Sequence, residues 1–132
     1  MFNAFRKTAG VPGGYSVPAT VRVNPISFTT SDQVTLRGYQ IEAYPADGEK
    51  KGSVLFVQGD AMLADQCVGW LSHLSKDGYD VFVYDFRGYG RSGGKSLFSD
   101  MVADYREIVN DFNLKTPGKH MLYAISFGGI VL

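Results

Sequence analysis

Three apolar segments separated by two helical patterns constrain what this chain of 132 residues can fold into. The segments are SVLFVQ (53–58), YDVFVYD (79–85) and KHMLYAIS (119–126), and each reads as a strand that is buried on both faces. Between them lie patterns typical of helices, near 64–76 and 100–113. Strands that alternate with helices predict a parallel sheet with right-handed crossovers. We therefore expect an α/β fold in which helices cover both faces of a mostly parallel sheet.

Both helices are predicted from their apolar stripes and from their ends. The apolar stripe of the first helix consists of Cys67, Trp70, Leu71 and Leu74. The stripe of the second helix consists of Val102, Tyr105, Val109 and Phe112. Ser99 is the expected N-cap of the second helix, and Gly78 follows the end of the first.

The region before the first buried strand predicts an irregular segment followed by an antiparallel hairpin. Residues 1–24 mix Gly, Pro and Ser and predict an irregular lead-in, so that the folded domain spans 25–132. The segments 26–30 and 34–44 flank a polar turn and predict an antiparallel hairpin. Along its second arm the alternation of apolar residues shifts after Gly38, which predicts a bulge there.

Charge and composition exclude several classes of protein. The 13 basic residues balance the 13 acidic ones, so no bulk attraction to nucleic acid or to an anionic membrane is encoded. The sequence has no apolar run of about 18 residues that could span a membrane, and its start lacks the pattern of a secretory signal. Cys67 is the only cysteine, which excludes an internal disulfide. We expect a cytoplasmic protein that uses no metal, no cofactor and no obligate partner.

The last predicted strand ends at Ser126, in the sequence LYAISFGG. In a parallel sheet, catalytic and ligand-binding residues usually lie at the carboxyl ends of the strands. A nucleophilic serine on a tight strand-to-helix turn needs small residues two positions before and after it, and here these are Ala124 and Gly128. Gly129 adds further room, and the start of the following helix would aim N–H groups at a developing oxyanion. The alternative is a serine that only ends a strand and caps a helix.

A glycine-rich loop supports a competing hypothesis. Gly88-x-Gly90-x-x-Gly93 directly follows a predicted strand, and this is formally a dinucleotide-binding pattern. That chemistry requires the last glycine to lie on the first turn of a helix that holds a pyrophosphate. Here the next helix begins several residues later, and Tyr89 stands where a P-loop would need its first glycine. A nucleotide-binding module that uses the loop 88–96 is the competing hypothesis.

Three segments together resemble the α/β-hydrolase superfamily over residues 25–132. LFVQGDA is similar to its strand and oxyanion loop, VYDFRGYGRSGG to its Asp-x-Arg-Gly-x-Gly-x-Ser segment, and YAISFGG to its nucleophile elbow. The chain most resembles the lysophospholipase-like and serine-aminopeptidase-like branches. The resemblance implies a serine hydrolase that attacks the carbonyl of a small-molecule ester, thioester or amide and forms an acyl-enzyme at Ser126.

The resemblance also implies roles for residues around this serine. The backbone N–H groups of Phe127 and Asp60 would form the oxyanion hole. Residues that would shape the loops without reacting are Gln58, Gly59, Asp85, Arg87, Gly88, Gly90 and Ser92. Asp85 and Arg87 are expected to form an ion pair that closes their turn rather than to contact substrate.

Two residues depart from the family's pattern. Gln58 stands where the family has histidine, and Asp60 places a carboxylate beside an intended anion site, where it would oppose an oxyanion. These departures favour a third hypothesis, a hydrolase-like scaffold or interaction domain without catalysis.

The acid and the histidine of the family's catalytic triad follow the serine in the sequence, but only FGGIVL follows Ser126. His120 lies on the same strand, about 20 Å from Ser126 at about 3.3 Å per residue, and His73 lies on the polar side of a helix. Neither histidine can reach the serine, since a general base must lie within about 3 Å. We expect the N-terminal half of a hydrolase, which by itself has negligible turnover.

Overall fold

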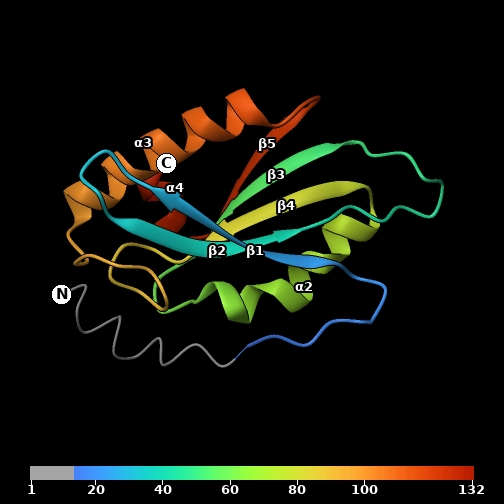
Figure 1. The fold of residues 1–132 in the computed structure, drawn as a ribbon, viewed down its shortest axis with the longest axis horizontal. Helices are drawn as coiled ribbons and strands as arrows, with labels where there is room; N and C mark the ends of the chain where they lie inside the picture. The colour runs from blue at the N-terminus through green and yellow to red at the C-terminus, as the bar shows by residue number, and fades with distance from the viewer. Residues whose placement is uncertain (1–13) are drawn as a thin grey trace.

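The structure is a computed structural model that describes residues 14–132 (Figure 1). Its strands are β1 (Val23–Thr29), β2 (Thr35–Ile41), β3 (Gly52–Val57), β4 (Tyr79–Tyr84) and β5 (His120–Ala124). Its helices are α2 (Ala64–Lys76), α3 (Phe98–Lys115) and α4 (Phe127–Val131). Every predicted strand and helix is present, and α2 has the predicted ends. The predicted lead-in lies partly outside the described residues, and its boundary with the domain stays a prediction.

The five strands form one sheet in the order β1-β2-β4-β3-β5. β2 pairs antiparallel with β1 and β4, whereas β3 pairs parallel with β4 and β5. The carboxyl ends of β3, β4 and β5 therefore lie at the same edge of the sheet. In Figure 1, α2 lies on one side of the sheet and α3 and α4 lie on the other. The predicted hairpin and the α/β class are confirmed.

Each face of the sheet carries its own apolar core. The core against α2 includes Ile41, Phe56, Cys67, Leu71 and Val81. The core against α3 and α4 includes Leu36, Leu55, Phe86, Tyr105 and Phe127. The strands β3 and β4 contribute to both cores, which explains why their sequences are apolar without alternation.

The predicted bulge at Gly38 is wrong. The ladder between β1 and β2 runs through this position without interruption, and Gly38 pairs with Ile26. The alternation of apolar residues shifts because Leu36 and Ile41 belong to cores on opposite faces of the sheet. A glycine is needed at position 38 because a Cβ atom there would overlap the carbonyl oxygen of Val83 on the neighbouring strand.

The strand β5 is less buried than predicted, because it is the edge strand of the described sheet. Its side chains Leu122 and Tyr123 are 50% and 41% exposed. Trp70 of α2 was expected to face inward, but it lies near this edge and is 37% exposed. Its ring packs edge-on against Phe56, with the ring centroids 4.9 Å apart.

The helix α3 begins earlier than predicted, so the assignment of Ser99 as its N-cap is wrong. Leu97 occupies the N-cap position, and no side-chain hydrogen bond caps the helix there. The buried residues of α3 are Met101, Asp104, Tyr105, Ile108 and Phe112. Tyr105 and Phe112 of the predicted stripe are therefore confirmed, whereas Val102 and Val109 are only partly buried.

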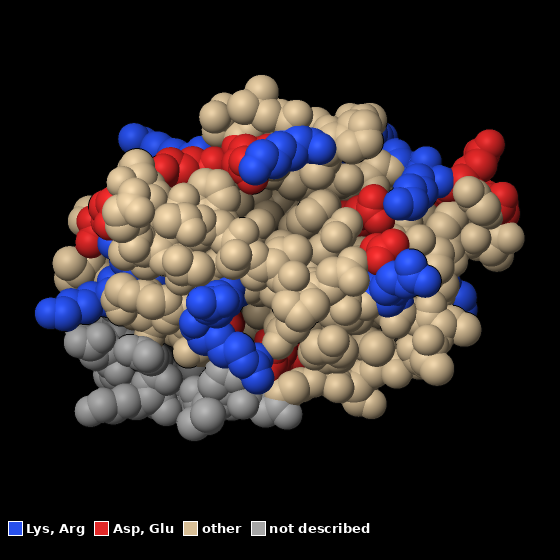
Figure 2. All heavy atoms as spheres, viewed as in Figure 1, with Lys and Arg blue, Asp and Glu red and all other residues tan. Residues whose placement is uncertain are grey.

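Basic and acidic side chains are interspersed over the face of the molecule shown in Figure 2. None of the helices described in residues 14–132 combines the length and the apolar character that a membrane crossing requires.

Candidate active site

Ser126 lies in the turn between β5 and α4, at the carboxyl edge of the sheet. Its backbone has φ 50° and ψ −114°, a combination outside the regions that residues other than glycine usually adopt. Hydrogen bonds from the Gly128 N–H to the Ile125 carbonyl (2.9 Å) and from the Gly129 N–H to the Ser126 carbonyl (3.0 Å) close the turn. The serine is exposed. The chain therefore bends sharply at an accessible hydroxyl, and backbone strain of this kind concentrates at functional sites.

The turn packs tightly against the end of β3. A Cβ atom at position 128 would overlap the carbonyl oxygen of Val57 and lie 2.8 Å from that of Gln58. At position 129 a Cβ atom would meet no described heavy atom within 4 Å. Close approach of the backbone thus requires glycine at 128 but not at 129. Ala124, which pairs with Val57 in the β3–β5 ladder, is partly buried, and its methyl group is accommodated there.

This difference between the two glycines predicts opposite effects of alanine. Gly128→Ala is expected to lower the free energy of unfolding by about 1–3 kcal/mol, because the backbone carbonyls that it meets cannot rotate away. Gly129→Ala should leave the free energy of unfolding unchanged or raise it slightly, because alanine is more stable than glycine at an exposed position in a helix. Urea denaturation of both variants measures the difference. Equal stability of the two variants would contradict the tight contact between the turn and β3.

The loop that follows β3 lies beside the serine. A Cβ atom built on Gly59 would be 3.6 Å from the Cβ atom of Ser126. Ala61 in the same loop has a positive φ of 59°, which is uncommon for a residue with a side chain. The backbone N–H of Asp60 has no hydrogen-bond partner within residues 14–132. This loop therefore offers an uncommitted backbone donor close to Ser126.

Gln58, at the start of this loop, is fully buried. Its side-chain Nε2 donates a hydrogen bond to the carbonyl oxygen of Tyr84 at the end of β4, at 2.6 Å. Its Oε1 has no partner in the described part of the chain. The glutamine thus ties the end of β3 to the end of β4.

Asp85 and Arg87 do not pair with each other, so the predicted ion pair that closes the turn is wrong. The Asp85 carboxylate instead accepts hydrogen bonds from the N–H groups of Ala64 (2.7 Å) and Arg91 (3.3 Å). It thereby holds the first residue of α2 against the loop that follows β4. Burial raises the pKa of Asp85 to about 6, although these two N–H groups oppose the shift. A Cβ atom at Gly90 would lie 2.6 Å from the Asp85 Cγ, so the loop backbone packs directly on this carboxylate.

Arg87 is held by carboxylates from two other segments. Its Nη1 and Nη2 donate to Asp32 in the hairpin turn, at 2.8 and 2.9 Å. Its Nε and Nη2 donate to Asp104 on α3, at 2.9 and 2.5 Å. The guanidinium holds the pKa of Asp32 well below its usual range. Arg87 therefore joins the hairpin, the loop after β4 and α3.

The glycine-rich loop is closed on itself and on β2. The Gly88 N–H donates to the Gly93 carbonyl (2.7 Å), the Ser92 N–H to the Tyr89 carbonyl (2.9 Å), and the Gly93 N–H to the Thr35 carbonyl (2.9 Å). The Ser92 hydroxyl also accepts a hydrogen bond from the Arg37 N–H of β2 and donates one to the carbonyl of Asp85, which directly follows β4. Most of the backbone N–H groups between Gly88 and Gly93 are already engaged, which argues against the nucleotide-binding hypothesis.

The sequence reasoning did not single out the side chain of Tyr89. The ring is fully buried, but its hydroxyl has no hydrogen-bond partner among the described residues. The Oδ1 atom of Asp60 is likewise buried without a partner. The two groups come from adjacent loops at the carboxyl edge of the sheet. The only signal in the sequence was an aromatic residue with a polar tip inside a glycine-rich turn.

The two histidines lie away from Ser126. His73 is exposed on α2. His120 is the first residue of β5, at the opposite end of the strand from the serine, and its ring bonds the Thr116 carbonyl. No group of residues suited to hold a metal ion occurs in the described part of the chain.

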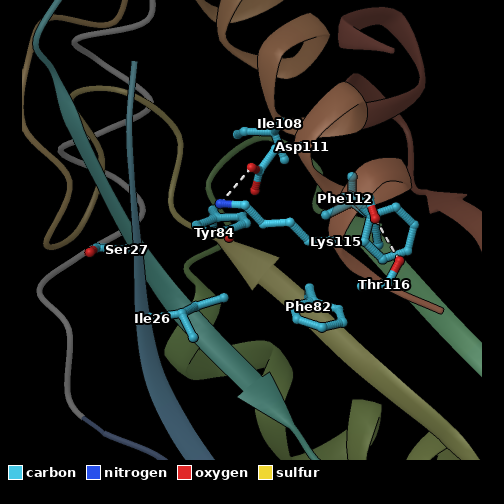
Figure 3. Close-up of a pocket in the computed structure, with 10 residues that line it drawn as sticks. Ile26, Ser27, Phe82, Tyr84, Ile108, Asp111, Phe112, Lys115 and Thr116 are labelled. Atoms are coloured by element: carbon cyan, nitrogen blue, oxygen red, sulfur yellow. Dashed lines mark hydrogen bonds and ion pairs between the residues drawn. The ribbon is translucent and has the colours of Figure 1, made fainter. Parts of the chain in front are cut away.

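A pocket of about 180 Å³ lies beside α3 and is separate from the serine turn (Figure 3). Its apolar lining includes Ile26, Phe82 and Phe112, and the ion pair of Asp111 with Lys115 (2.8 Å) lies beside it. None of its lining residues belongs to the serine turn or to the loops that follow β3 and β4. The pocket is therefore not part of the candidate active site.

The sequence profile of the family described as serine aminopeptidase, S33, matches residues 48–132. The chain belongs to this family of α/β hydrolases. The matched segment contains β3, β4, β5 and all of the loops that surround Ser126.

The chain is also similar to a curated protein and to solved structures. Protein phosphatase methylesterase 1 of Candida albicans is 30% identical over 99 residues, which cover 72% of this chain and 28% of the methylesterase. The Pyrococcus furiosus esterase Pf2001 has a TM-score of 0.65 at 26% identity, covering 92% of this chain and 48% of the esterase. The α/β hydrolase GrgF from a Penicillium species has a TM-score of 0.68 at 23% identity, covering 83% and 39%, and this likeness shows the fold alone. The S33-family chain thus spans between about a quarter and a half of the length of these proteins.

Proposed function

We propose that this chain carries the nucleophile of a serine hydrolase, and that the nucleophile is Ser126. The observation that carries the proposal is the strained φ of 50° at an exposed serine between a parallel strand and a helix. A serine that merely ended a strand would need no such conformation. The fit of Gly128 against the end of β3 supports the same assignment, because it allows the tight turn.

Two backbone donors would hold the oxyanion. One is the N–H of Phe127, the first residue of α4, and the other is the N–H of Asp60 in the loop beside the serine. The position of Gly59 against Ser126 supports this pairing, since it brings the two loops together. Donors of this kind stabilise the transition state because they are already oriented where the charge develops.

The proposed reaction is an acyl transfer in two steps. Ser126 Oγ attacks the carbonyl carbon and loses its proton to a general base, while the carbonyl electron pair moves to the oxyanion. Collapse of this intermediate expels the alcohol, thiol or amine, which takes up the proton, and leaves an ester on Ser126. Water then attacks the ester and releases the carboxylic acid. Because His73 and His120 lie away from the serine, the base would come from outside these 132 residues.

Carboxylic esters are the substrates that we favour. Two of the relatives are named for ester chemistry, a methylesterase and an esterase. Thioesters and amides would share the same mechanism, and the residues described here do not select among them.

The test compares residues 1–132 alone with the protein in its full natural length. We expect a fluorophosphonate probe to label the full-length protein at Ser126, and p-nitrophenyl acetate to be hydrolysed. The 132 residues alone should show negligible turnover, because the serine lacks its base. Robust serine-dependent turnover by the 132 residues would contradict the need for an outside base. A full-length protein that the probe does not label would favour the non-catalytic scaffold, for which the Asp60 carboxyl is the supporting observation.

A further inference from the structure

The pocket beside α3 has a structural cause in the register of the sheet. Gly38 of β2 pairs with Ile26 of β1 on one side and with Tyr84 of β4 on the other. Residues directly opposite each other in a sheet lie on the same face. Because glycine has no side chain, a space opens between Ile26 and Tyr84, and both line the pocket. A Cβ atom at position 38 would overlap the Val83 carbonyl oxygen, so the packing of the sheet itself keeps this position without a side chain.

The walls of the pocket are apolar and partly aromatic (Figure 3). Leu55 of β3 and Ile108 of α3 contribute aliphatic surface, and both are buried. The rings of Phe82 and Phe112 meet edge-on, with centroids 5.6 Å apart. A further ring placed against these two can make the edge-to-face contacts that aromatic groups prefer. An apolar cavity of about 150 Å³ with similar walls holds benzene, so the 180 Å³ of this pocket suit one ring with a small substituent.

Tyr84 supplies one polar group to this apolar pocket. The residue is 8% exposed and lines the pocket. The side chains of Gln58 and Tyr105 donate to its backbone carbonyl, at 2.6 and 3.5 Å, but its hydroxyl has no hydrogen-bond partner among residues 14–132. The hydroxyl retains some accessible surface, unlike the closed-off oxygens of Asp60 and Tyr89. A ligand in the pocket can therefore form a hydrogen bond with it.

The charges at the pocket favour a neutral ligand. Asp111 and Lys115 both line the pocket, and they form an ion pair at 2.8 Å across one turn of α3. Their opposite charges offset each other, so the pair selects neither an anion nor a cation. The hydroxyl of Thr116 is also engaged, because it donates to the Phe112 carbonyl at 2.5 Å. A charged ligand would have to place its charge against apolar walls without a free partner, which is unfavourable.

We propose that this pocket binds a neutral molecule with a single aromatic ring and one hydroxyl or carbonyl group. The ring lies against Phe82 and Phe112, and the polar group forms a hydrogen bond with the Tyr84 hydroxyl. The volume leaves no room for a second ring or a long acyl chain. The site is separate from the turn at Ser126, so the proposal does not depend on the role of that serine.

Phenol and toluene test the proposal, because they have equal numbers of heavy atoms and only phenol can form the hydrogen bond. The full-length protein, labelled with ¹³C at its isoleucine methyl groups, is titrated with each compound and followed by NMR. Phenol should shift the methyl signals of Ile26 and Ile108 with a Kd of about 1 mM or tighter. Tyr84→Phe should weaken phenol binding by about 3- to 10-fold and change toluene binding by less than about twofold.

Tyr105→Phe is the matched control. Tyr105 is buried in the same core and its hydroxyl bonds the carbonyl of Tyr84, but it does not line the pocket. This variant should bind both compounds as the wild type does. Ile26→Phe should fill the pocket and weaken both compounds by about tenfold or more, with Ile108 as the remaining reporter.

Three results would overturn the inference. The first is a wild-type protein in which phenol shifts neither methyl signal at ten times the expected Kd. The second is a Tyr84→Phe variant that binds phenol as tightly as the wild type, or that loses phenol and toluene to the same extent. The third is a folded Ile26→Phe variant, verified by thermal unfolding, that still binds both compounds with wild-type affinity. If Ile26→Phe does not fold, the titrations of the wild type and of Tyr84→Phe decide the question.

Discussion

Ser126→Ala in the full-length protein is expected to lower kcat for ester hydrolysis by about 10⁵-fold or more. The reason is that the proposed acyl-enzyme forms on the Ser126 Oγ, and no other hydroxyl of the turn can replace it. The variant should keep its fold, because the side chain is exposed and removal of one oxygen from it leaves the core unchanged. Steady-state hydrolysis of p-nitrophenyl acetate, with thermal unfolding to verify the fold, measures the effect.

The control for this substitution is Ser99→Ala, which removes the hydroxyl of another exposed serine, on α3. It should leave both turnover and fluorophosphonate labelling unchanged. A Ser126→Ala variant that kept a tenth or more of wild-type turnover would refute Ser126 as the nucleophile. Turnover reduced to the same extent in both variants would refute it as well.

Arg87→Ala is expected to lower the free energy of unfolding by about 3–5 kcal/mol. The side chain of Arg87 is 7% exposed and that of Asp104 is 2% exposed, so loss of the arginine leaves a buried carboxylate without its cation. The same substitution releases the hairpin turn, which is held through Asp32. Equilibrium denaturation in urea measures the loss, and the unfolding midpoint should fall without a large change in slope.

Two controls separate burial from charge. Lys115→Ala breaks the ion pair of Lys115 with Asp111 on α3, the helix that also carries Asp104. Because the lysine side chain is 76% exposed, the free energy of unfolding should fall by about 0.5 kcal/mol or less. The double variant Arg87→Met/Asp104→Leu should be more stable than Arg87→Ala, because apolar side chains in place of both partners leave no buried charge. If Arg87→Ala cost no more than Lys115→Ala, the buried ion pair would not hold these segments together as described.

Much of the fold could be predicted because its signals are local. Apolar runs, helical stripes and turn residues identified all five strands and the two longer helices, and the ends of α2 were predicted without error. The tight turn at Ser126 was also local information, because small residues at 124 and 128 are needed for it. Gly128 shows the physical basis, since a side chain there would meet the backbone of β3.

The errors concern contacts between segments that are distant in the sequence. Arg87 was expected to pair with a residue two positions away, but its partners are Asp32 and Asp104. The change in the alternation of apolar residues after Gly38 was attributed to a bulge, because the sequence does not show which face of the sheet each helix covers. The exposure of β5 likewise depends on its place at the edge, which is a property of the sheet order.

In the candidate site, too, some features follow from the local sequence and others from contacts between distant segments. The sequence alone determined the fold class, the family resemblance and the serine turn, because steric requirements of the backbone act over a few neighbouring residues. Only the tertiary structure decided which loops meet at that turn, that Asp85 holds the start of α2, and that one oxygen each of Asp60 and Tyr89 is buried without a partner among residues 14–132. Such contacts arise when parallel strands bring their carboxyl ends to one edge, and the energy of a buried polar group depends on neighbours that the local sequence does not contain.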